Sequence, residues 1–501
     1  MKHTVKIEPL GISCTVHPDT PLRDILTQYG MEFPCAGQGI CGNCRIELLQ
    51  GNIALTEAHR KALQTKRINN LSTRLACLCR VTEDITVRIS QFSHIILADH
   101  SDFSFTPDQG YGIAVDLGST TLVSQLLNLE NGKIEGVETA LNPQTAYGAD
   151  LISRISFAME SQENALLLTS IIRETLGKQI ENLYRSRPCG LHKIRIVGNT
   201  VMHHLFCGLD LSPLAVYPFF SPHSGEYRFT PQDLNWQIPS STEICFLPNI
   251  GGFVGSDILA GIRATRMYEK EKYQLLIDLG TNGEIAIGNR QRILCASTAA
   301  GPAFEGSNIT QGIRATEGAI VGVKQSNGRI EAQILGNGKA KGICGSGLID
   351  AIEVFLESGE IDVTGNFTTE KPRLHLTNDI YLYPQDIREF QLAKAAIAAG
   401  IQLLLNRLNI THHDIEQVFI AGGFGHYIHL AHAIRLGLLE FEETRIVRLS
   451  NSALTGAKIA LFETDDCFHD ILRLTEPLSL ETLPDFQDIF CEKMFFYSPA
   501  E

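Results

Sequence analysis

The feature that most constrains the fold of this chain is a short motif that occurs twice. An apolar run leads into Asp116-Leu117-Gly118-Ser119-Thr120-Thr121, and the same order of residue types returns at Asp278-Leu279-Gly280-Thr281-Asn282-Gly283. Each copy predicts a strand, a tight turn and a returning strand, because glycine and small polar residues interrupt two aliphatic runs. A chain that builds such a hairpin twice is expected to form two related α/β lobes.

The composition of both turns indicates phosphate binding. Glycine lets backbone amides approach phosphate oxygens without steric obstruction, and a Ser or Thr hydroxyl adds a donor. The aspartates that end the strands, Asp116 and Asp278, can hold Mg²⁺ or its waters. Two facing hairpins would clamp the triphosphate of ATP, and since no Walker A sequence occurs, the fold differs from that of P-loop proteins. The predicted nucleotide-binding residues of the turns are Gly118, Ser119, Thr120, Thr121, Gly280, Thr281, Asn282 and Gly283.

A third element follows a buried strand near residue 420. The apolar run ends in a turn that contains Gly422, Gly423 and Gly425, where an adenine and a ribose could lie against bare backbone. The three elements in this order resemble the superfamily of acetate kinases, sugar kinases, heat-shock chaperones and actin. This resemblance implies a two-lobed actin-like ATPase built from duplicated RNase H-like units.

A cluster of cysteines in the first ninety residues indicates a metal centre. Cys35, Cys41 and Cys44 are separated by glycine-rich stretches, and Cys77 follows later. Three thiolates that converge on neighbouring irons need a tight loop free of bulky side chains, which glycine provides. A zinc site is a minority alternative, because it would need two Cys-x-x-Cys pairs and only one is present. The match of 37–42 to a dinucleotide fingerprint is weak, since cysteines fill the loop.

The spacing of these cysteines resembles that of β-grasp [2Fe-2S] ferredoxins of the adrenodoxin-like branch. The resemblance implies that Cys35, Cys41, Cys44 and Cys77 hold a 2Fe-2S cluster, with Cys77 in the setting Arg-Leu-Ala-Cys. Cys79 lies two positions further on and is expected to be a spare.

A ferredoxin followed by an ATPase resembles the reductive activators of corrinoid enzymes over essentially the whole chain. The motifs that carry this resemblance are Asn142-Pro143-Gln144, Tyr147-Gly148-Ala149-Asp150, Arg154, Gly198-Asn199-Thr200, Met202-His203-His204, 251–257, 301–306, 344–350 and 485–496. It implies that ATP drives one electron from the cluster to cob(II)alamin on a corrinoid protein, giving cob(I)alamin. It also adds Gly345 and Ser346 as nucleotide contacts and Asp257, with Asp116 and Asp278, as a candidate catalytic carboxylate.

The expected architecture is an α+β ferredoxin domain followed by an α/β ATPase. Its expected parts are a ferredoxin-type domain at 1–92, a linker at 93–110, a first lobe at 111–270, a second lobe with the adenine turn at 271–465, and a C-terminal segment packing back on the ATPase at 466–501. Because larger relatives have an extra domain between ferredoxin and ATPase, a short form lacking this middle domain is expected.

Charge and hydropathy exclude some partners. The net charge of -14 argues against nucleic acid, and no uninterrupted apolar stretch is long enough for a membrane span. A cytoplasmic protein is expected, with an upstream low-potential electron donor and a homodimer implied by the family. Two alternatives stay open at this point: a redox-sensing, nucleotide-gated binding protein, and an activator of a radical dehydratase.

Two groups of histidines are expected to be structural. His203 and His204 are adjacent, so on a helix their side chains diverge, and packing is favoured over metal ligation. His426, His429 and His432 recur every three residues, and a surface or partner contact is favoured over a set of metal ligands because no carboxylate or cysteine joins them.

Overall fold

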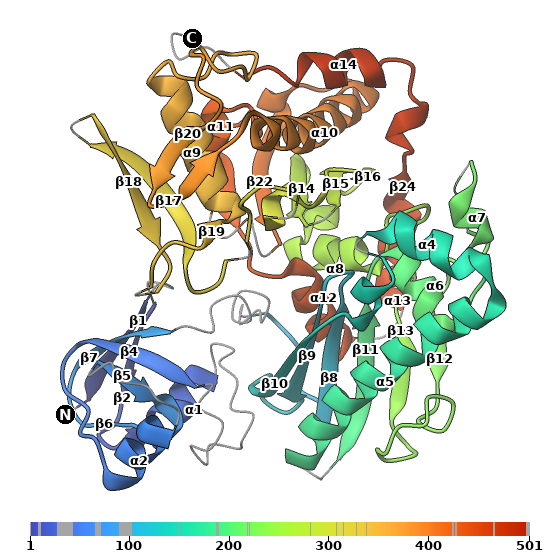
Figure 1. The fold of residues 1–501 in the computed structure, drawn as a ribbon. Coiled ribbons are helices and arrows are strands. Elements are labelled where there is room, and N and C mark those ends of the chain that lie inside the picture. The colour runs from blue at the N-terminus through green and yellow to red at the C-terminus, as the bar shows by residue number, and fades with distance from the viewer. Residues whose placement is uncertain are drawn as a thin grey trace.

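The computed structural model describes the chain apart from residues 1, 9–11, 28–43, 66–71, 90–102, 149, 187–189, 218, 220, 281, 307, 314, 327, 337, 423–424, 426–427, 464–465 and 497–501. A small N-terminal domain lies beside a larger body that has two lobes (Figure 1). The prediction of a ferredoxin-type domain followed by an actin-like α/β fold is confirmed.

The N-terminal domain is built on a five-stranded mixed sheet with the order β2-β1-β7-β4-β5. Its central strands β1 and β7 are parallel, and the other pairs are antiparallel, which is the β-grasp arrangement. The elements are β1 (His3–Glu8), β2 (Ile12–Val16), β3 (Thr20–Pro21), α1 (Leu22–Thr27), β4 (Arg45–Gln50), α2 (Glu57–Thr65), β5 (Thr73–Leu75), η1 (Ala76–Leu78), β6 (Arg80–Val81) and β7 (Ile85–Ile89).

The first lobe contains a six-stranded sheet with the order β10-β9-β8-β11-β13-β12. Strands β8, β11 and β13 are parallel, so their carboxyl ends meet at one edge. The elements are β8 (Tyr111–Leu117), β9 (Thr121–Asn128), β10 (Ile134–Leu141), η2 (Pro143–Ala146), α4 (Leu151–Glu160), α5 (Gln162–Ser186), β11 (Leu191–Val197), α6 (Thr200–Cys207), α7 (Ser212–Ala215), β12 (Tyr227–Phe229), β13 (Glu243–Phe246), α8 (Ser256–Thr265) and η3 (Met267–Glu269).

The second lobe repeats this plan in a six-stranded sheet with the order β23-β22-β14-β15-β16-β24. Its elements are β14 (Tyr273–Leu279), β15 (Gly283–Gly288), β16 (Ile293–Thr298), η4 (Pro302–Glu305), β17 (Ala319–Ser326), β18 (Arg329–Ile334), β19 (Gly342–Ile343), α9 (Gly345–Glu357), β20 (Leu374–Thr377), β21 (Ile380–Leu382), α10 (Pro384–Leu408), η5 (His412–Asp414), β22 (Ile415–Ala421), α11 (Leu430–Arg435), η6 (Glu443–Arg445), β23 (Ile446–Arg448), α12 (Ser452–Ala460), α13 (Asp466–Leu474), β24 (Thr475–Pro477), η7 (Leu480–Thr482) and α14 (Phe486–Glu492).

A shared layer of helices joins the two sheets. Helices α8 and α12 lie between them (Figure 1), and one hydrophobic cluster contains residues of both helices and of both sheets. The helices approach closely because small residues face each other. A Cβ atom added to Gly456 of α12 would lie 2.2 Å from the carbonyl oxygen of Ala260 in α8. This contact fixes how the two lobes sit on one another.

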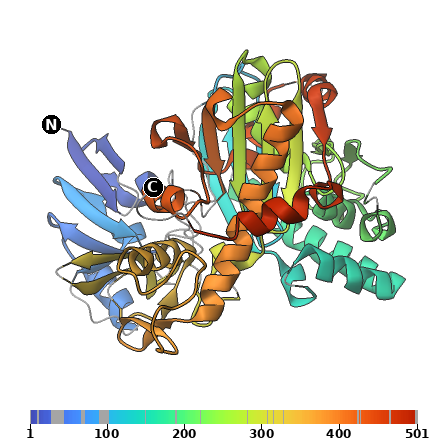
Figure 2. The ribbon, with the colours of Figure 1, turned by 90° about the horizontal axis from the view of Figure 1, so that it is seen from above.

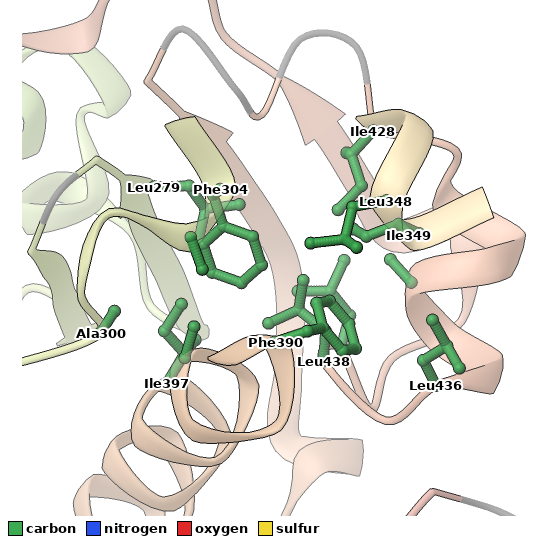
Figure 3. Close-up of a cluster of buried hydrophobic side chains, with 14 of the residues drawn as sticks. Leu279, Ala300, Phe304, Leu348, Ile349, Phe390, Ile397, Ile428, Leu436 and Leu438 are labelled. Carbon is green, nitrogen blue, oxygen red and sulfur yellow. The ribbon is translucent and has the colours of Figure 1, made fainter. Parts of the chain in front are cut away.

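The outer face of each sheet is covered by other helices. Alternate residues of β8, such as Ile113 and Val115, pack toward α5 and α6, while Ala114 faces the shared layer. In the second lobe, α9 and α10 cover the sheet, and the rings of Phe304 and Phe390 meet edge to face with centroids 6.0 Å apart (Figure 3). The molecule is therefore a stack of alternating helical and sheet layers.

The C-terminal segment returns to the ATPase body. Helix α14 lies against the long helix α10, as the view from above also shows (Figure 2). The buried side chains of Gln391 and Lys394 on α10 donate hydrogen bonds to the carbonyl oxygens of Met494 and Phe495. In the part of the chain that the structure describes, no helix combines the length and the apolar character needed to cross a membrane.

Candidate functional site

The first predicted phosphate hairpin lies at the carboxyl ends of parallel strands. Strand β8 ends at Leu117, and the backbone N–H of Gly118 donates to the carbonyl oxygen of Thr121 over 3.1 Å, which closes the turn. Gly198, just after β11, lies against this strand end, since a Cβ there would be 2.7 Å from the oxygen of Leu117. Gly255, just before α8, packs on Gly198 in the same way, with 2.3 Å to its oxygen. Three loops therefore meet where α/β folds bind ligands.

Asp116 is tied to the shared helical layer. One of its carboxylate oxygens accepts a hydrogen bond of 2.7 Å from the side-chain amide of Asn451. The other side-chain atom of Asn451, its oxygen, caps α12 by accepting from the backbone N–H of Leu454. A residue far away in the sequence thereby orients the first aspartate of the site, and no sequence motif around Asn451 indicates this.

The second hairpin brings another pair of carboxylates to the same region. Asp278 of β14 lies directly opposite Glu284 of β15. Gly422 follows β22, has φ +88°, and a Cβ there would lie 2.7 Å from a carboxylate oxygen of Asp278. The turn predicted to hold adenine therefore touches the second predicted phosphate hairpin, and glycine is required there for both its conformation and its lack of a side chain.

Four carboxylates of the two lobes have raised pKa values. Burial raises the pKa of Asp116 to about 6, and burial together with the charge of Asp116 raises the pKa of Asp278 to about 7. Burial, with Asp116 and Asp278 as further causes, raises the pKa of Asp257 to about 7. The pKa of Glu284 is also raised by burial and by Asp257 and Asp278. Sequence reasoning missed Glu284, although an acid in an otherwise apolar strand was a signal.

This arrangement fits a magnesium-bound polyphosphate. Among the described residues, no three His, Cys, Asp or Glu side chains are placed to hold a metal ion by themselves. Mg²⁺ characteristically keeps several waters and takes one or two carboxylates together with substrate phosphates. A bound Mg²⁺ would reduce the electrostatic repulsion among these clustered carboxylates. The carboxylates therefore fit a metal that arrives with the nucleotide.

The start of α9 is fastened to the neighbouring sheet. A Cβ atom on Gly347 would lie 2.2 Å from the oxygen of Ile320, and the hydroxyl of Ser346 donates to the carbonyl oxygen of Val321 over 2.8 Å. Ser346, predicted to contact the nucleotide, thus uses its proton to hold the helix to β17. Gly345 is the first residue of the same helix and is buried.

Strand pairing brings two of the predicted cluster ligands together. Arg45 of β4 lies opposite Leu75 of β5, so Cys44 and Cys77 lie at one end of this pair. Their sulfur atoms are 3.2 Å apart. This juxtaposition of thiols fits an iron-sulfur centre. The thiol of Cys79 instead donates to the carbonyl oxygen of Leu75, and burial raises its pKa to about 12.

Four of the predicted site residues lie outside the described residues: Cys35, Cys41, Thr281 and Gly423. The remaining predicted residues of the turns, Gly118 to Thr121, Gly280, Asn282, Gly283, Gly422 and Gly425, all lie in loops or strand ends of the two lobes.

The histidine predictions have different outcomes. His203 and His204 are fully buried in α6, and His204 contacts the oxygen of Thr200 and the hydroxyl of Ser221, so the packing role is confirmed. For His432, the expectation that no carboxylate joins it is wrong. Its ring lies 2.6 Å from Asp350 and 3.5 Å from Glu353, because α9 runs beside α11. The carboxylates come from a helix distant in sequence.

Comparisons with known proteins define the class of protein. Three family models match: the 2Fe-2S iron-sulfur cluster binding domain at residues 5–82, the RACo middle region at 111–270, and the C-terminal domain of RACo, described as the ASKHA domain, at 272–500. The chain is thus a 2Fe-2S domain joined to an ATPase of the actin-like type. The model of the RACo middle region matches the segment that forms the first lobe, so the chain contains a region of that name, and the expected absence of an extra domain between this lobe and the ferredoxin domain stays a prediction.

Similar proteins identify the family. The chain is 33% identical over 440 residues to the corrinoid activation enzyme RamQ of Eubacterium limosum, a match that spans 80% of this chain and 74% of RamQ. It is 27% identical over 426 residues to a Co(II) methylated amine-specific corrinoid protein reductase of Methanosarcina barkeri, covering 77% of each. A solved reductive activator for a corrinoid iron-sulfur protein superposes with a TM-score of 0.70 at 24% identity, over 99% of this chain and 98% of that one. The chain belongs to the RACo family.

Replacing single cysteines tests which thiols serve the cluster. Cys77→Ser is expected to lower iron and sulfide content after anaerobic reconstitution by at least about half, because a hydroxyl is a poor substitute for a thiolate ligand. Cys79→Ser is the matched control and should retain wild-type iron, since its thiol is occupied by the oxygen of Leu75. Equal iron content in the two variants would contradict the assignment of Cys77.

Titration of Asp278 should appear in both stability and binding. Its pKa of about 7 in the folded protein exceeds the ordinary value of 3.8, so it favours the folded state below about pH 4, and this contribution is lost as pH rises through 7. Asp278→Asn should therefore raise the free energy of unfolding at pH 8 by about 1 kcal/mol or more, with little gain at pH 4. The same variant should weaken MgATP binding. Chemical denaturation at both pH values, with calorimetric titration, measures the two effects, and a loss of stability at pH 8 would refute this account.

Proposed function

We propose that this protein reductively activates a corrinoid protein, with ATP driving the transfer of one electron. The observation that carries the proposal is the union on one chain of a paired-thiol β-grasp domain and two lobes whose strand and helix ends bring together four carboxylates with raised pKa values. The names of the relatives from Eubacterium limosum and Methanosarcina barkeri support a corrinoid protein as the client. Residues 1–92 would carry the electron, and 111–270 and 271–465 would form the nucleotide-binding lobes.

The electron balance of the proposed reaction is simple. A 2Fe-2S cluster held by Cys35, Cys41, Cys44 and Cys77 would supply one electron, and cobalt would pass from Co(II) to Co(I). A low-potential donor would then return one electron to the cluster. Plant-type clusters lie near about -400 mV, and each further 59 mV uphill costs about a factor of ten in the equilibrium constant. A step toward a lower potential therefore needs an additional source of free energy.

The ATPase part would provide that free energy through conformational preference. The phosphates would be gripped by the turn at Gly118 to Thr121 and by its counterpart at Gly280 to Gly283, with Asp116, Asp257 and Asp278 facing the metal and the attacking water. Because the two turns belong to different lobes, a bound nucleotide favours a closed arrangement and hydrolysis releases it. Docking of the client to one of these states would make the electron transfer directional.

A reduction assay tests the proposal. The protein, reconstituted with iron and sulfide and reduced by titanium(III) citrate, should convert a cob(II)alamin-loaded corrinoid protein to cob(I)alamin when MgATP is present, as followed by visible absorbance. Cys77→Ser should abolish reduction while MgATP binding stays within about twofold of wild type. Asp278→Asn should abolish it while the cluster spectrum is unchanged. Reduction at equal rates with and without ATP would refute the proposal.

We also propose that two copies of the chain associate through the outer helices of the first lobe. Ile152 and Met159 share one face of α4, because they are seven residues apart, and both side chains are more than half exposed. Leu166, on the adjoining helix α5, is 60% exposed. Exposed apolar side chains gathered in this way mark interaction surfaces. Figure 1 places α4 on the side of the molecule away from the N-terminal domain.

Light scattering measures this association. A mass of twice 55.2 kDa is expected for the wild type. Ile152→Glu should shift the mass toward one chain, because a charge would be buried in the interface. Leu392→Glu, at an exposed leucine on α10, is the control and should leave the mass unchanged. A wild-type mass of one chain would contradict the proposal.

A further inference from the structure

All four backbone carbonyls of the first phosphate turn are held by donors from the protein. The oxygen of Gly118 accepts from the side-chain amide of Asn142 over 2.9 Å, and the oxygen of Ser119 accepts from the guanidinium of Arg154 over 2.5 Å. The oxygen of Thr120 accepts from the backbone N–H of Asn142, and that of Thr121 from the N–H of Gly118. Every peptide plane of the turn is therefore fixed in orientation.

The two side-chain donors approach from the same side of the turn. The amide nitrogen of Asn142 and a guanidinium nitrogen of Arg154 both contact the sulfur of Met202, at 3.6 Å and 3.5 Å. Met202 is fully buried in the core of the first lobe. Asn142 and Arg154 thus grip two successive carbonyl groups from the core side.

Because the peptide unit is planar and trans, the direction of each held carbonyl group also fixes the direction of the N–H group that follows it. Within one peptide unit the C=O and the following N–H point in opposite directions. Since the oxygens of Gly118 and Ser119 point toward the core, the N–H groups of Ser119 and Thr120 point away from it. Two successive amides on the same side form a concavity that attracts anions.

Arg154 is an unusual residue for this position. It is fully buried, and its hydrogen bonds go to the carbonyl oxygens of Ser119 and Gly148, the side-chain oxygen of Gln144 and the sulfur of Met202. Within the described part of the chain, none of these bonds goes to a carboxylate. Burial lowers the pKa of Arg154 to about 10, and the nearby charge of Asp150 offsets only part of that effect.

A buried cation without an ion-pair partner is costly unless an anion compensates it. The turn directly in front of Arg154 is the one expected to bind phosphate. Gly148 permits the close fit, since a Cβ there would lie 2.8 Å from the nitrogen and 2.9 Å from Cγ of Arg154. Arg154 lies more than thirty residues after Ser119, so it is not part of the sequence motif that forms the hairpin.

We propose that Arg154 is a positioning residue for the nucleotide, which aims the amides of Ser119 and Thr120 at the phosphates and supplies a positive charge behind them. Asn142 has the same role for the preceding peptide, since its side-chain amide holds the carbonyl oxygen of Gly118. This inference rests on the proposed nucleotide-dependent function and extends it to residues that do not themselves touch the phosphates.

Binding of MgADP tests the proposal without turnover. Arg154→Met should weaken MgADP binding by about tenfold or more in calorimetric titration, because both the charge and the grip on Ser119 are lost. Gly148→Ala should weaken it in the same direction by a smaller factor. The control is Arg173→Met in the same lobe, whose guanidinium donates to the oxygen of Phe206, and it should bind MgADP within about twofold of wild type.

Thermal unfolding separates positioning from a merely structural role. The temperature shift that MgADP produces should shrink in Arg154→Met and persist in Arg173→Met, whatever each variant does to the nucleotide-free protein. If Arg154→Met loses stability but keeps wild-type MgADP affinity, the proposal is overturned. If Arg154→Met does not fold, Arg154→Lys provides the test. One ammonium group cannot reach the carbonyl oxygens of both Ser119 and Gly148, so wild-type MgADP affinity in Arg154→Lys would also overturn the proposal. A wild-type protein that binds no MgADP would instead refute the proposed function.

Discussion

The shared layer formed by α8 and α12 is the contact on which the rest of the ATPase body depends. Small residues let the two helices touch, α8 contacts strands of both sheets, and α12 contacts β8 and β11 of the first lobe. Both helices also begin at the site: Asp257 lies in the first turn of α8, and Asn451 caps α12 while it bonds Asp116. The packing that joins the lobes therefore also sets the distance between their two phosphate turns. A change in that packing would therefore shift the positions of Asp116 and Asp257.

The charges at the candidate site explain why a bound nucleotide should change the arrangement of the two lobes. Burial raises the pKa of Asp116, and burial together with the charges of neighbouring carboxylates raises the pKa values of Asp257, Asp278 and Glu284. Arg154 lies buried behind the first turn, and none of its hydrogen bonds among the described residues goes to a carboxylate. Like charges in a low-dielectric site are costly, and so is a lone cation. A magnesium-bound polyphosphate supplies both a cation for the acids and anions for the arginine. The free energy of its binding is then available to bring the lobes together.

Much of this was predictable from the sequence because local patterns carry it. The repeated Asp-x-Gly hairpins predicted two lobes, and the cysteine spacing predicted the N-terminal domain, since strand and turn chemistry act over a few residues. Other features depend on the tertiary fold. Asn451 reaches Asp116 only because α12 crosses to the first lobe, and His432 meets Asp350 only because α11 lies along α9. Arg154 stood among the motifs of the family resemblance, but only the geometry of the turn shows what it holds.

The N-terminal domain and the ATPase act together, because ATP turnover makes an unfavourable electron transfer from the cluster proceed. Single-turnover electron paramagnetic resonance tests this coupling most directly, with the prereduced protein mixed with a cob(II)alamin corrinoid protein and frozen at intervals. The account predicts that the reduced-cluster signal and the Co(II) signal disappear together, one for one, only when MgATP is present. Loss of both signals at the same rate without nucleotide, or loss of the Co(II) signal while the cluster stays reduced with no excess reductant, would contradict it.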